Sequence, residues 1–456
     1  MRINTNITAL TACRNLTVSE RKSSQSIERL SSGYKINSSK DNPVGAALST
    51  KMKSQLKNLD KAAQSTQDGI SVIETAESVL SETQSMVQRI RELCVQAAND
   101  TYTDKDRESI MAEIDQLKTE IDRVSEDTDF NTKKLLNGDL GRKSFTNIAG
   151  VDATYISTEV DAGEYELHIM NQATQASYTS GNVSSGVSGS VKINGVSVDI
   201  EETDSIDEIY TKMRDAADKT GVEVSREGDT FTYTSKRYGS KYGVVIECSN
   251  TDIQSSLGLG TGKIQEYGTD IEVELVSGTN SKFSPNATAA CDGNKIVITD
   301  NDGFKLRIDV EGETDGDRII LHVTDIGAMT VQVGANAGQD MDIDIPRVDC
   351  RMMELDDILA YTSGGAGEAL GICDAAIEYI SEIRSRIGAY QNRMEHTQSS
   401  LDATTENMTS ALSRITDVDM AEEMTTYTTQ SVISQAATSM LAQANEMPDK
   451  VLQLLQ

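Results

Sequence analysis

The sequence ISEIRSRIGAYQNRMEHTQSSLDATTENMTSALSRI, residues 380–415, decides the fold of this chain of 456 residues. Apolar and small residues recur in it in alternating steps of three and four: Ile380, Ile383, Ile387, Tyr390, Met394, Thr397, Leu401, Thr404, Met408, Ala411 and Ile415. This spacing is typical of a helix that packs lengthwise against another helix. At about 1.5 Å per residue, the helix is more than roughly 50 Å long. It therefore needs a long helical partner.

The N-terminal part of the chain supplies a matching pattern. Asn42 followed by Pro43 fits a helix N-cap with proline at the first helical position. The helix is expected to end near Asn99, and Thr103 with Asp106 then forms a capping box for a second helix. The apolar positions of the two helices are Ile73, Ala76, Leu80, Thr83, Val87, Ile90, Cys94 and Ala97, then Ile110, Ile114, Leu117, Ile121 and Val124. We infer that the two ends of the chain pack together around an inserted middle.

The middle of the chain carries the signals of β-strands. Apolar residues alternate in 191–193 and 196–200 on either side of Asn194-Gly195, which predicts a type I′ hairpin. Ser205 with Glu208 predicts the start of a short helix. Alternation resumes in 222–233 and 304–310. We expect one α+β domain here, or two small ones in tandem. The fold class is therefore a mainly α rod of long antiparallel, coiled-coil helices formed by both chain ends, with an inserted α+β outer domain.

Both extreme ends carry apolar stripes among Ser, Thr, Asn and Gln, with few charges. The stripe residues are Ile3, Ile7, Leu10, Met440, Leu441, Val451, Leu454 and Leu455. Because an isolated helix of this kind is marginal in water, we expect both ends to be disordered in the free monomer. They should become helical against each other and against neighbouring copies. A head-to-tail contact of this kind does not close on itself, so it predicts self-assembly into a helical filament.

Composition and charge argue against several classes of function. The chain has 42 Lys+Arg and 72 Asp+Glu, a formal net charge of −30, which repels phosphate backbones and anionic lipid. Aromatic residues make up 4%, which leaves little for a ligand-stacking pocket. No apolar run is long enough to span a membrane, and the N-terminus lacks the features of a secretory signal peptide. We expect no nucleic-acid binding and no membrane insertion.

Motifs of catalysis and metal binding are not recognisable in the sequence. The three histidines belong to no metal-binding pattern, and residues 258–263 lack the spacing of a phosphate loop. The acidic residues Asp300, Asp302 and Asp309 lack the glutamate of a calcium loop. Six scattered cysteines indicate small buried or exposed thiols: Cys13, Cys94, Cys248, Cys291, Cys350 and Cys373. We expect no enzyme activity, catalytic residue, cofactor or metal.

Both ends of the chain resemble bacterial flagellins. The matching segments are 3–6, 27–33, 36–38, 68–71 and 439–445, followed by Val451 and Leu454-Leu455. The resemblance implies a structural subunit that polymerises into the extracellular flagellar filament for motility, with the terminal helices lining its central channel. It also implies secretion through the flagellar type III export apparatus, with an export chaperone and the filament cap as further partners.

The resemblance extends into the middle of the chain. Residues 190–200 with the following helix are similar to a motif shared by flagellin and hook-type outer domains, and 330–336 with 341–344 to the β-hairpin of the flagellin rod domain. The implied domains are a terminal helical domain, a helical rod domain with a β-hairpin near 330–345, and a variable α+β outer domain. Their ranges are 1–42 with 419–456, 43–140 with 329–418, and 141–328.

Residues 87–96 resemble the segment that animal Toll-like receptor 5 binds in many flagellins. The implied contact positions are Gln88, Arg89, Glu92, Leu93, Gln96, Ile110 and Glu113. On spacing alone, Val87 and Ile90 belong to the buried stripe, which leaves Arg89, Glu92 and Gln96 exposed, either to a receptor or to a neighbouring subunit. The resemblance further implies that Val451, Leu452, Leu454 and Leu455 are recognised by a cytosolic inflammasome receptor, a part of innate immune recognition.

Three alternatives compete with a filament subunit. A hook–filament junction protein shares the early Leu-Ser-Ser-Gly pattern and paired helical ends, although the match at 439–445 favours flagellin. A flagellin with a protease in its outer domain would need a zinc-binding motif that this chain lacks. A secreted adhesin with a coiled-coil stalk would normally require a signal peptide.

Overall fold

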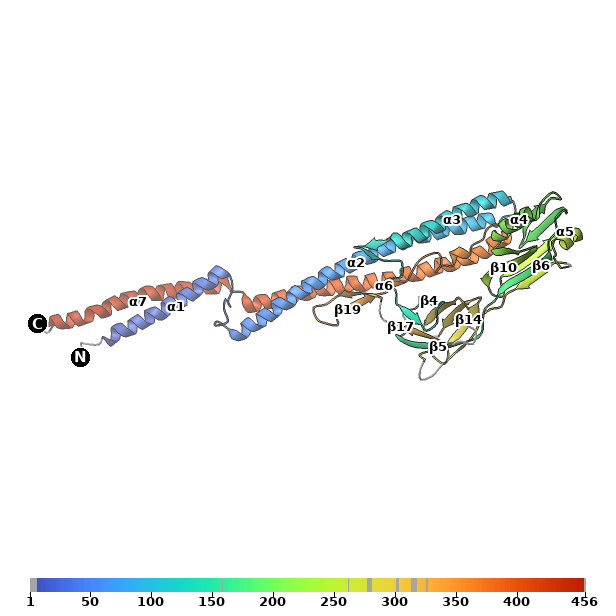
Figure 1. The fold of residues 1–456 in the computed structure, drawn as a ribbon. Helices are drawn as coiled ribbons and strands as arrows, with labels where there is room; N and C mark the ends of the chain where they lie inside the picture. The colour runs from blue at the N-terminus through green and yellow to red at the C-terminus, as the bar shows by residue number, and fades with distance from the viewer. Residues whose placement is uncertain are drawn as a thin grey trace. The chain divides into compact units, whose positions relative to one another are not determined.

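The structure, a computed structural model of the chain, describes residues 6–157, 159–260, 262–276, 281–300, 303–312, 318–324 and 327–454 (Figure 1). The side chains of 448–454 are not described. Of the predicted filament-core residues, Ile3 and Leu455 therefore lie outside the described residues, as do the side chains of Val451, Leu452 and Leu454. The chain divides into two compact units. The first comprises 1–69, 332–340 and 394–456, and the second 70–331 and 341–393.

The first unit contains the terminal helices α1 (Ile7–Ser32) and α7 (Met420–Leu454), which lie side by side (Figure 1). The Asn6 carboxamide starts α1 by accepting a hydrogen bond from the Ala9 N–H, and Gly33 ends it at φ 75°. The Asn6 side-chain amide also donates to the Ala444 carbonyl at 2.7 Å. Near the other end of α1, Arg29 pairs with Glu423 at 3.6 Å. Early residues of α1 meet late residues of α7, so the two helices are antiparallel.

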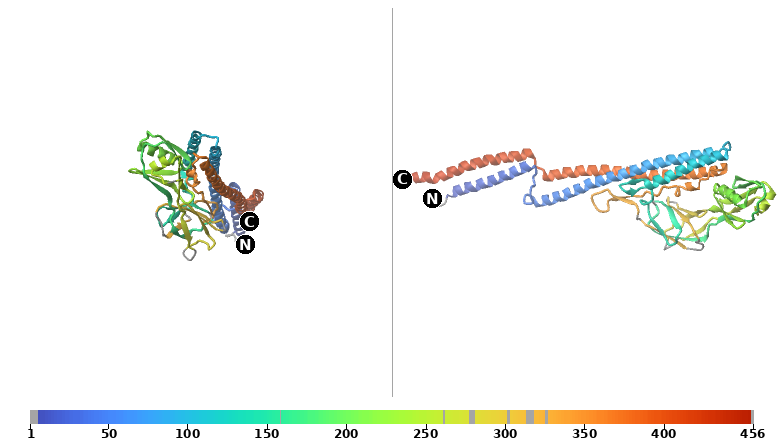
Figure 2. Two further views of the ribbon diagram at one scale, coloured as in Figure 1. Left: turned by 90° about the vertical axis from the view of Figure 1, so that its right-hand side faces the viewer. Right: turned by 45° about the horizontal axis from the view of Figure 1, so that its top comes forward.

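Three helices form the packed core of the second unit: the later part of α2 (Pro43–Ala97), all of α3 (Asp104–Asp127) and the earlier part of α6 (Ser363–Thr416). Both views in Figure 2 show α3 running back along α2. All eight predicted positions from Ile73 to Ala97 are buried, as are Ile380, Ile383 and Ile387 of α6. The predicted helical seam is confirmed in this unit.

Helix ends follow the predicted caps. The Asn42 Oδ1 accepts from the Gly45 N–H at 2.9 Å. Thr103 and Asp106 form the expected reciprocal capping box at the start of α3.

The sequence pattern placed more residues in the buried stripes than the structure buries. Leu117 and Val124 of α3 are only half-buried. Thr404, in the part of α6 that belongs to the first unit, is exposed and satisfies its hydroxyl by donating to the Ser400 carbonyl at 2.7 Å.

The strands form two separate lobes in the second unit (Figure 1). The outer lobe has two antiparallel sheets, ordered β13-β5-β17-β3 and β14-β15-β16-β4. Its strands are β3 (Ser144–Thr146), β4 (Val151–Ile156), β5 (Gly163–Asn171), β13 (Glu272–Leu275), β14 (Thr288–Asp292), β15 (Lys295–Thr299), β16 (Lys305–Val310) and β17 (Arg318–Val323). A hydrogen bond between the Tyr155 hydroxyl and Glu382 ties this lobe to α6.

The inner lobe is inserted between β5 and β13 of the outer lobe. Its sheets are ordered β6-β10-β9 and β12-β11-β7-β8. Its elements are β6 (Gln175–Asn182), β7 (Gly189–Ile193), β8 (Val196–Ile200), α4 (Ile206–Asp218), β9 (Val222–Glu227), β10 (Thr230–Tyr238), β11 (Gly243–Cys248), α5 (Thr251–Ser256) and β12 (Ile264–Tyr267). The type I′ turn between β7 and β8 is confirmed by φ 42° at Asn194 and 92° at Gly195.

The expected fold class, helices from both chain ends around an inserted α+β region, is confirmed, but the alternative of two tandem domains is wrong because the two lobes are nested. β5 pairs with β13 and with β17, both of which follow the whole inner lobe in the chain. Each lobe has its own hydrophobic core. The remaining short elements are β1 (Asp129–Phe130), β2 (Lys133–Lys134), β18 (Met329–Gln332), β19 (Asp340–Ile343) and the 3-10 turn η1 (Leu355–Asp357). β18 and β19 form a two-stranded sheet, in the region where the sequence predicts a hairpin.

Candidate functional site

The first candidate surface lies on α2 and α3 and is organised by Arg89. Its guanidinium donates to Glu113 Oε1 from Nε at 3.0 Å and from Nη2 at 2.8 Å. A third bond runs from Nη1 to Glu92 at 3.3 Å on the same helix. These hydrogen bonds, the Glu113 bonds first, raise the pKa of Arg89 above its usual value. All three side chains remain about half exposed or more, so the arrangement offers fixed charges to a partner.

The other positions predicted for this surface divide into exposed and buried ones. Gln88 and Gln96 are exposed, and the Gln96 amide donates to the Tyr102 hydroxyl at 3.0 Å. Leu93 is only 2% exposed and Ile110 only 7%. In this structure these two side chains belong to the helix packing and do not reach the surface. The α2–α3 surface, as the structure defines it, comprises Gln88, Arg89, Glu92, Gln96 and Glu113.

Sequence reasoning missed a buried arginine beneath this surface. Arg107 is 7% exposed and closes the connection between α2 and α3. Its Nε donates to the Ala97 carbonyl at 3.0 Å and its Nη2 to the Asn99 carbonyl at 3.2 Å. The spacing held a signal, because Arg107 stands one step before Ile110 in the same stripe of α3. The arginine satisfies the Ala97 carbonyl at the end of α2 and adds a second donor to the Asn99 carbonyl, which also accepts from the Tyr102 N–H.

The second candidate surface is the apolar exterior of α1 and α7. Ile7 is 69% exposed, Leu10 70% and Met440 61%, whereas Leu441 is half-buried. Further exposed large apolar residues on these helices are Val18, Ile27, Met420, Met424, Val432, Ile433 and Met447. The buried residues of α1 are Ser19 and Ser26. So much exposed apolar surface on two helices marks a protein–protein contact.

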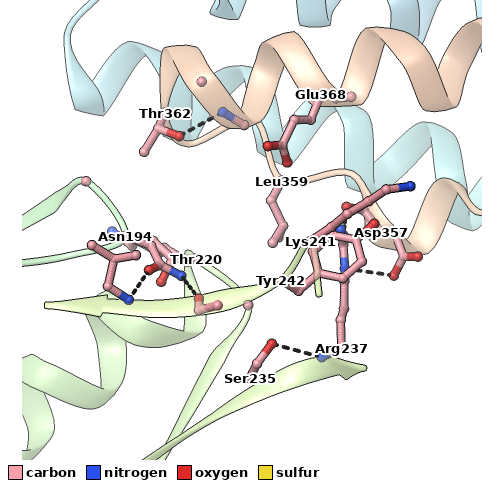
Figure 3. A pocket seen from close by; sticks show the side chains of 18 of the residues that line it. Asn194, Thr220, Ser235, Arg237, Lys241, Tyr242, Asp357, Leu359, Thr362 and Glu368 are labelled. Atoms are coloured by element: carbon pink, nitrogen blue, oxygen red, sulfur yellow. Dashed lines mark hydrogen bonds and ion pairs between the residues drawn. The ribbon is translucent and has the colours of Figure 1, made fainter. Parts of the chain in front are cut away.

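A cavity of about 490 Å³ lies in the second unit between the inner lobe and the start of α6 (Figure 3). Five cationic side chains line it: Lys192, Lys219, Arg237, Lys241 and Lys263. Four of them pair with carboxylates of the chain itself. Arg237, for example, pairs with Asp357 at 3.2 Å and lies over the Tyr242 ring at 4.7 Å. The charges of this cavity are balanced internally, so they give no reason to assign an anionic ligand.

In the part of the chain that the structure describes, one cluster has the spacing of metal ligands: Asp122, Cys350 and Asp356. The Asp122 carboxylate already accepts from the Cys350 N–H at 2.8 Å. The Cys350 thiol donates to the Lys118 carbonyl at 3.3 Å, and burial raises its pKa. Because metals bind the thiolate form, a thiol held in this way is a poor ligand. We assign no metal to this cluster.

Among the described residues, no helix is both long and apolar enough to cross a membrane.

Comparisons with known proteins match both ends of the chain. Residues 3–140 match the family model of the bacterial flagellin N-terminal helical region, and 370–455 that of the C-terminal helical region. A flagellin from Clostridium tyrobutyricum is 33% identical over 456 residues, covering 98% of this chain and 99% of that protein. Flagellin C of Vibrio cholerae is 32% identical over 458 residues, covering 99% of each.

Solved structures of flagellar proteins are similar only at a low level. Flagellar hook associated protein-3 from Legionella pneumophila has a TM-score of 0.32 at 12% identity and covers 80% of this chain and 98% of its own. FliC from Burkholderia pseudomallei has a TM-score of 0.25 at 16% identity and covers 71% of this chain and 99% of its own. The full-length matches are to flagellins, which favours a filament subunit over a junction protein. The chain therefore belongs to the bacterial flagellin family and is a structural subunit of the flagellar filament.

Proposed function

We propose that this flagellin polymerises through the apolar exterior of α1 and α7. The supporting observation is the exposure of Ile7, Leu10 and Met440 at 69%, 70% and 61% on helices that fully bury none of their large apolar side chains among the residues described. Burying one large aliphatic side chain contributes about 1.5–3 kcal/mol. A second copy of the chain can therefore supply stabilisation that the monomer lacks. The same proposed filament core includes Val451 and Leu454, together with Ile3 and Leu455.

Seeded elongation tests this proposal. Purified full-length protein is added to sheared filament fragments and examined by electron microscopy, beside a variant that lacks residues 447–456. We expect the full chain to elongate the seeds and the shortened chain to leave them unchanged, while its circular dichroism still shows extensive helix. Normal elongation by the shortened chain would contradict the role of the terminal helix. Failure of the full chain to elongate seeds would favour the hook–filament junction alternative.

We further propose that the α2–α3 surface binds host Toll-like receptor 5 in the free monomer. The fixed charges of Arg89, Glu92 and Glu113 support this proposal, because arginine in a rigid geometry is often a dominant contact of an interface. The buried Leu93 and Ile110 would act indirectly, by holding the two helices in place. The same surface is proposed to contact a neighbouring subunit in the filament, so receptor binding and assembly would compete.

A matched pair of arginines tests receptor binding. Arg89→Ala removes the centre of the surface. Arg123→Ala removes a similarly exposed arginine of α3 that pairs with Glu120 and Asp127 outside the surface. Binding of each monomer to the receptor ectodomain is measured together with receptor-dependent reporter signalling. We expect Arg89→Ala to weaken binding about tenfold or more and Arg123→Ala to leave it unchanged. Equal binding by both variants and the parent protein would contradict the proposal.

Membership of the flagellin family supports the remaining proposals. The chain would be secreted through the flagellar type III export apparatus, with an export chaperone and the filament cap as partners, and would have no enzymatic activity. A cytosolic inflammasome receptor would recognise the C-terminal stripe that contains Leu452. The domains proposed are those expected from the sequence: 1–42 with 419–456, 43–140 with 329–418, and 141–328. Deleting the export apparatus genes of the producing bacterium should leave the protein inside the cell, which immunoblotting of the medium would show.

A further inference from the structure

Two cysteines face each other in the helix packing of the second unit. Cys94 belongs to the buried stripe of α2, and Cys373 lies on α6; both are 0% exposed. Each thiol is the leading influence on the pKa of the other, which puts the two side chains in contact. Beside them, Arg91 Nε lies 2.6 Å from Asp374 Oδ1, so an ion pair holds α2 against α6 at this level. The two sulfur atoms are therefore kept close by packing and by an adjacent charged pair.

The other four cysteines have different surroundings. Cys13 is exposed on α1, and Cys248 and Cys291 are half-buried on β11 and β14, which belong to different lobes. Cys350 is buried, but its thiol donates to the Lys118 carbonyl. Cys350 thus resembles Cys94 and Cys373 in burial and differs in what its sulfur contacts. This difference makes it a matched control.

The contact between the two thiols makes the cysteines chemically unequal. It lowers the pKa of Cys94, because the Cys373 thiol stabilises the Cys94 thiolate. The same contact, together with burial, raises the pKa of Cys373, which therefore keeps its proton. The thiolate is the nucleophilic form of cysteine, so Cys94 is the sulfur that reacts first.

We propose that Cys94 and Cys373 form a site of oxidative modification, at which a peroxide links them in a disulfide between α2 and α6. This inference goes beyond filament assembly and receptor binding, neither of which requires it. Cys94 attacks one oxygen of hydrogen peroxide, the O–O bond breaks, and the departing hydroxide takes up a proton to leave as water, giving a sulfenic acid. The Cys373 sulfur then attacks the sulfenic sulfur, and the S–O bond breaks as the S–S bond forms. The displaced oxygen takes the Cys373 proton and leaves as a second water.

Burial controls when this reaction occurs. Both thiols are inaccessible in the closed packing, so peroxide reaches them only when the helices part locally or while the chain folds. Once formed, the disulfide connects two residues that are separated in sequence by both lobes. A cross-link over so long a segment restricts the unfolded chain strongly and stabilises the folded state. Oxidised protein should therefore melt at a higher temperature than reduced protein.

Peptide mapping tests the proposal on folded full-length protein. The exposed Cys13 is first replaced by the substitution Cys13→Ser, to prevent links between molecules. The folded protein is treated with hydrogen peroxide, quenched in acid, unfolded with N-ethylmaleimide and digested with trypsin without reduction. We expect one linked product, made of peptide 92–105 with Cys94 and peptide 352–384 with Cys373, which separates on reduction.

Two further variants, each with Cys13→Ser, control the assignment. Cys373→Ser should abolish the linked product and the rise in melting temperature, whereas Cys350→Ser should retain both. Circular dichroism before quenching establishes that each variant is folded. The proposal is overturned if Cys94 and Cys373 both carry N-ethylmaleimide after oxidation of the folded protein. It is equally overturned if the link forms only after unfolding, or if Cys94 links mainly to a cysteine other than Cys373.

Discussion

The terminal helix α1 buries serines and exposes isoleucine and leucine, whereas α2, α3 and α6 in the second unit bury mainly apolar residues. Ser19 and Ser26 are the buried residues of α1, while Ile7 and Leu10 are 69% and 70% exposed. In the second unit, Ile90 of α2 is 0% exposed. Both regions use long antiparallel helices. The difference lies in where the apolar side chains point, and it separates packing that is complete within one chain from packing that needs another copy.

The polar contacts of the two regions differ in the same direction. α1 and α7 are joined by contacts such as Ser19 Oγ, which donates to the Gln430 carbonyl at 3.0 Å. In the second unit, ion pairs flank an apolar interior, and Arg384 meets Glu77 at 2.7 Å beside it. A polar contact between exposed helices adds little net stability, because water offers the same hydrogen bonds. The terminal pair is thus aligned by hydrogen bonds but weakly held until its apolar exterior is covered.

The largest loss of stability should come from a substitution that opens a cavity in the second unit. Ile90→Ala removes a fully buried side chain and should lower the free energy of unfolding by about 2–5 kcal/mol. Urea unfolding of the monomer, followed by circular dichroism, measures the loss. Gln88→Ala, at an exposed position two residues earlier, should change the free energy by less than about 0.5 kcal/mol. Equal losses at the two positions would mean that α2 is not packed as described.

The second prediction concerns the terminal pair, where the effect should fall on assembly. Leu10→Ala should leave monomer stability nearly unchanged, because the side chain is 70% exposed. It should weaken subunit addition by about 2 kcal/mol, which is roughly a thirtyfold rise in the critical concentration. Sedimentation of seeded filaments measures that concentration. Thr11→Ala, at the next exposed position, should cause a much smaller rise. A destabilised monomer with unchanged assembly would reverse the comparison.

The helical part of the fold was predictable because each helix carries its own spacing and caps. The stripe from Ile73 to Ala97 and the capping box at Thr103 are local patterns, and both are present. The nested lobes were not predictable, since β5 pairs with β13 and β17 after the whole inner lobe. Nothing near β5 in sequence specifies partners so distant. Sheet pairing of this kind depends on tertiary packing more than on local preference.

The candidate surface was predictable in its charges and less so in its apolar members. Arg89 and Glu92 are exposed because Val87 and Ile90 occupy the buried positions of this part of α2. Leu93 is also buried, although it lies off the three-four stripe. α2 is covered by both α3 and α6 in the second unit, so its buried arc is wider than a seam against one partner. A sequence stripe predicted for packing against one helix leaves out the residues that a second helix buries.

The third prediction concerns the stability of the connection between α2 and α3. Arg107→Lys keeps the charge but replaces two directed donors, to the Ala97 and Asn99 carbonyls, with one ammonium group. We expect the free energy of unfolding to fall by about 1.5 kcal/mol, because a buried carbonyl loses a hydrogen bond from a charged donor. Urea unfolding measures this change. Arg14→Lys on the exposed face of α1 should have no measurable effect, and an equal loss there would remove the contrast between the two regions.

The smallest effect should come from the helix cap of the second unit, and it should depend on pH. Thr103→Ala removes the cap of α3 and should cost about 1 kcal/mol. Hydrogen bonds from Thr103, the side-chain bond first, lower the pKa of Asp106, so the folded state favours the Asp106 carboxylate. This contribution is present above the pKa of the unfolded chain and is lost as the pH falls through the lower pKa of the folded chain.

Because the hydroxyl bond is the leading cause of that shift, Thr103→Ala should also flatten the acid side of the stability curve. The measurement is urea unfolding at a series of pH values from neutral to strongly acidic, for the variant and its parent. The two curves should lie furthest apart at neutral pH and come closer in acid, where Asp106 is protonated in both states and the variant lacks only the cap bond from the Asp106 N–H. Curves that stay parallel throughout would mean that Asp106 does not share in the cap. A Thr8→Ala variant, which loses an exposed hydroxyl bond to Asn6 at the start of α1, should give parallel curves, since its partner is a carboxamide that does not titrate.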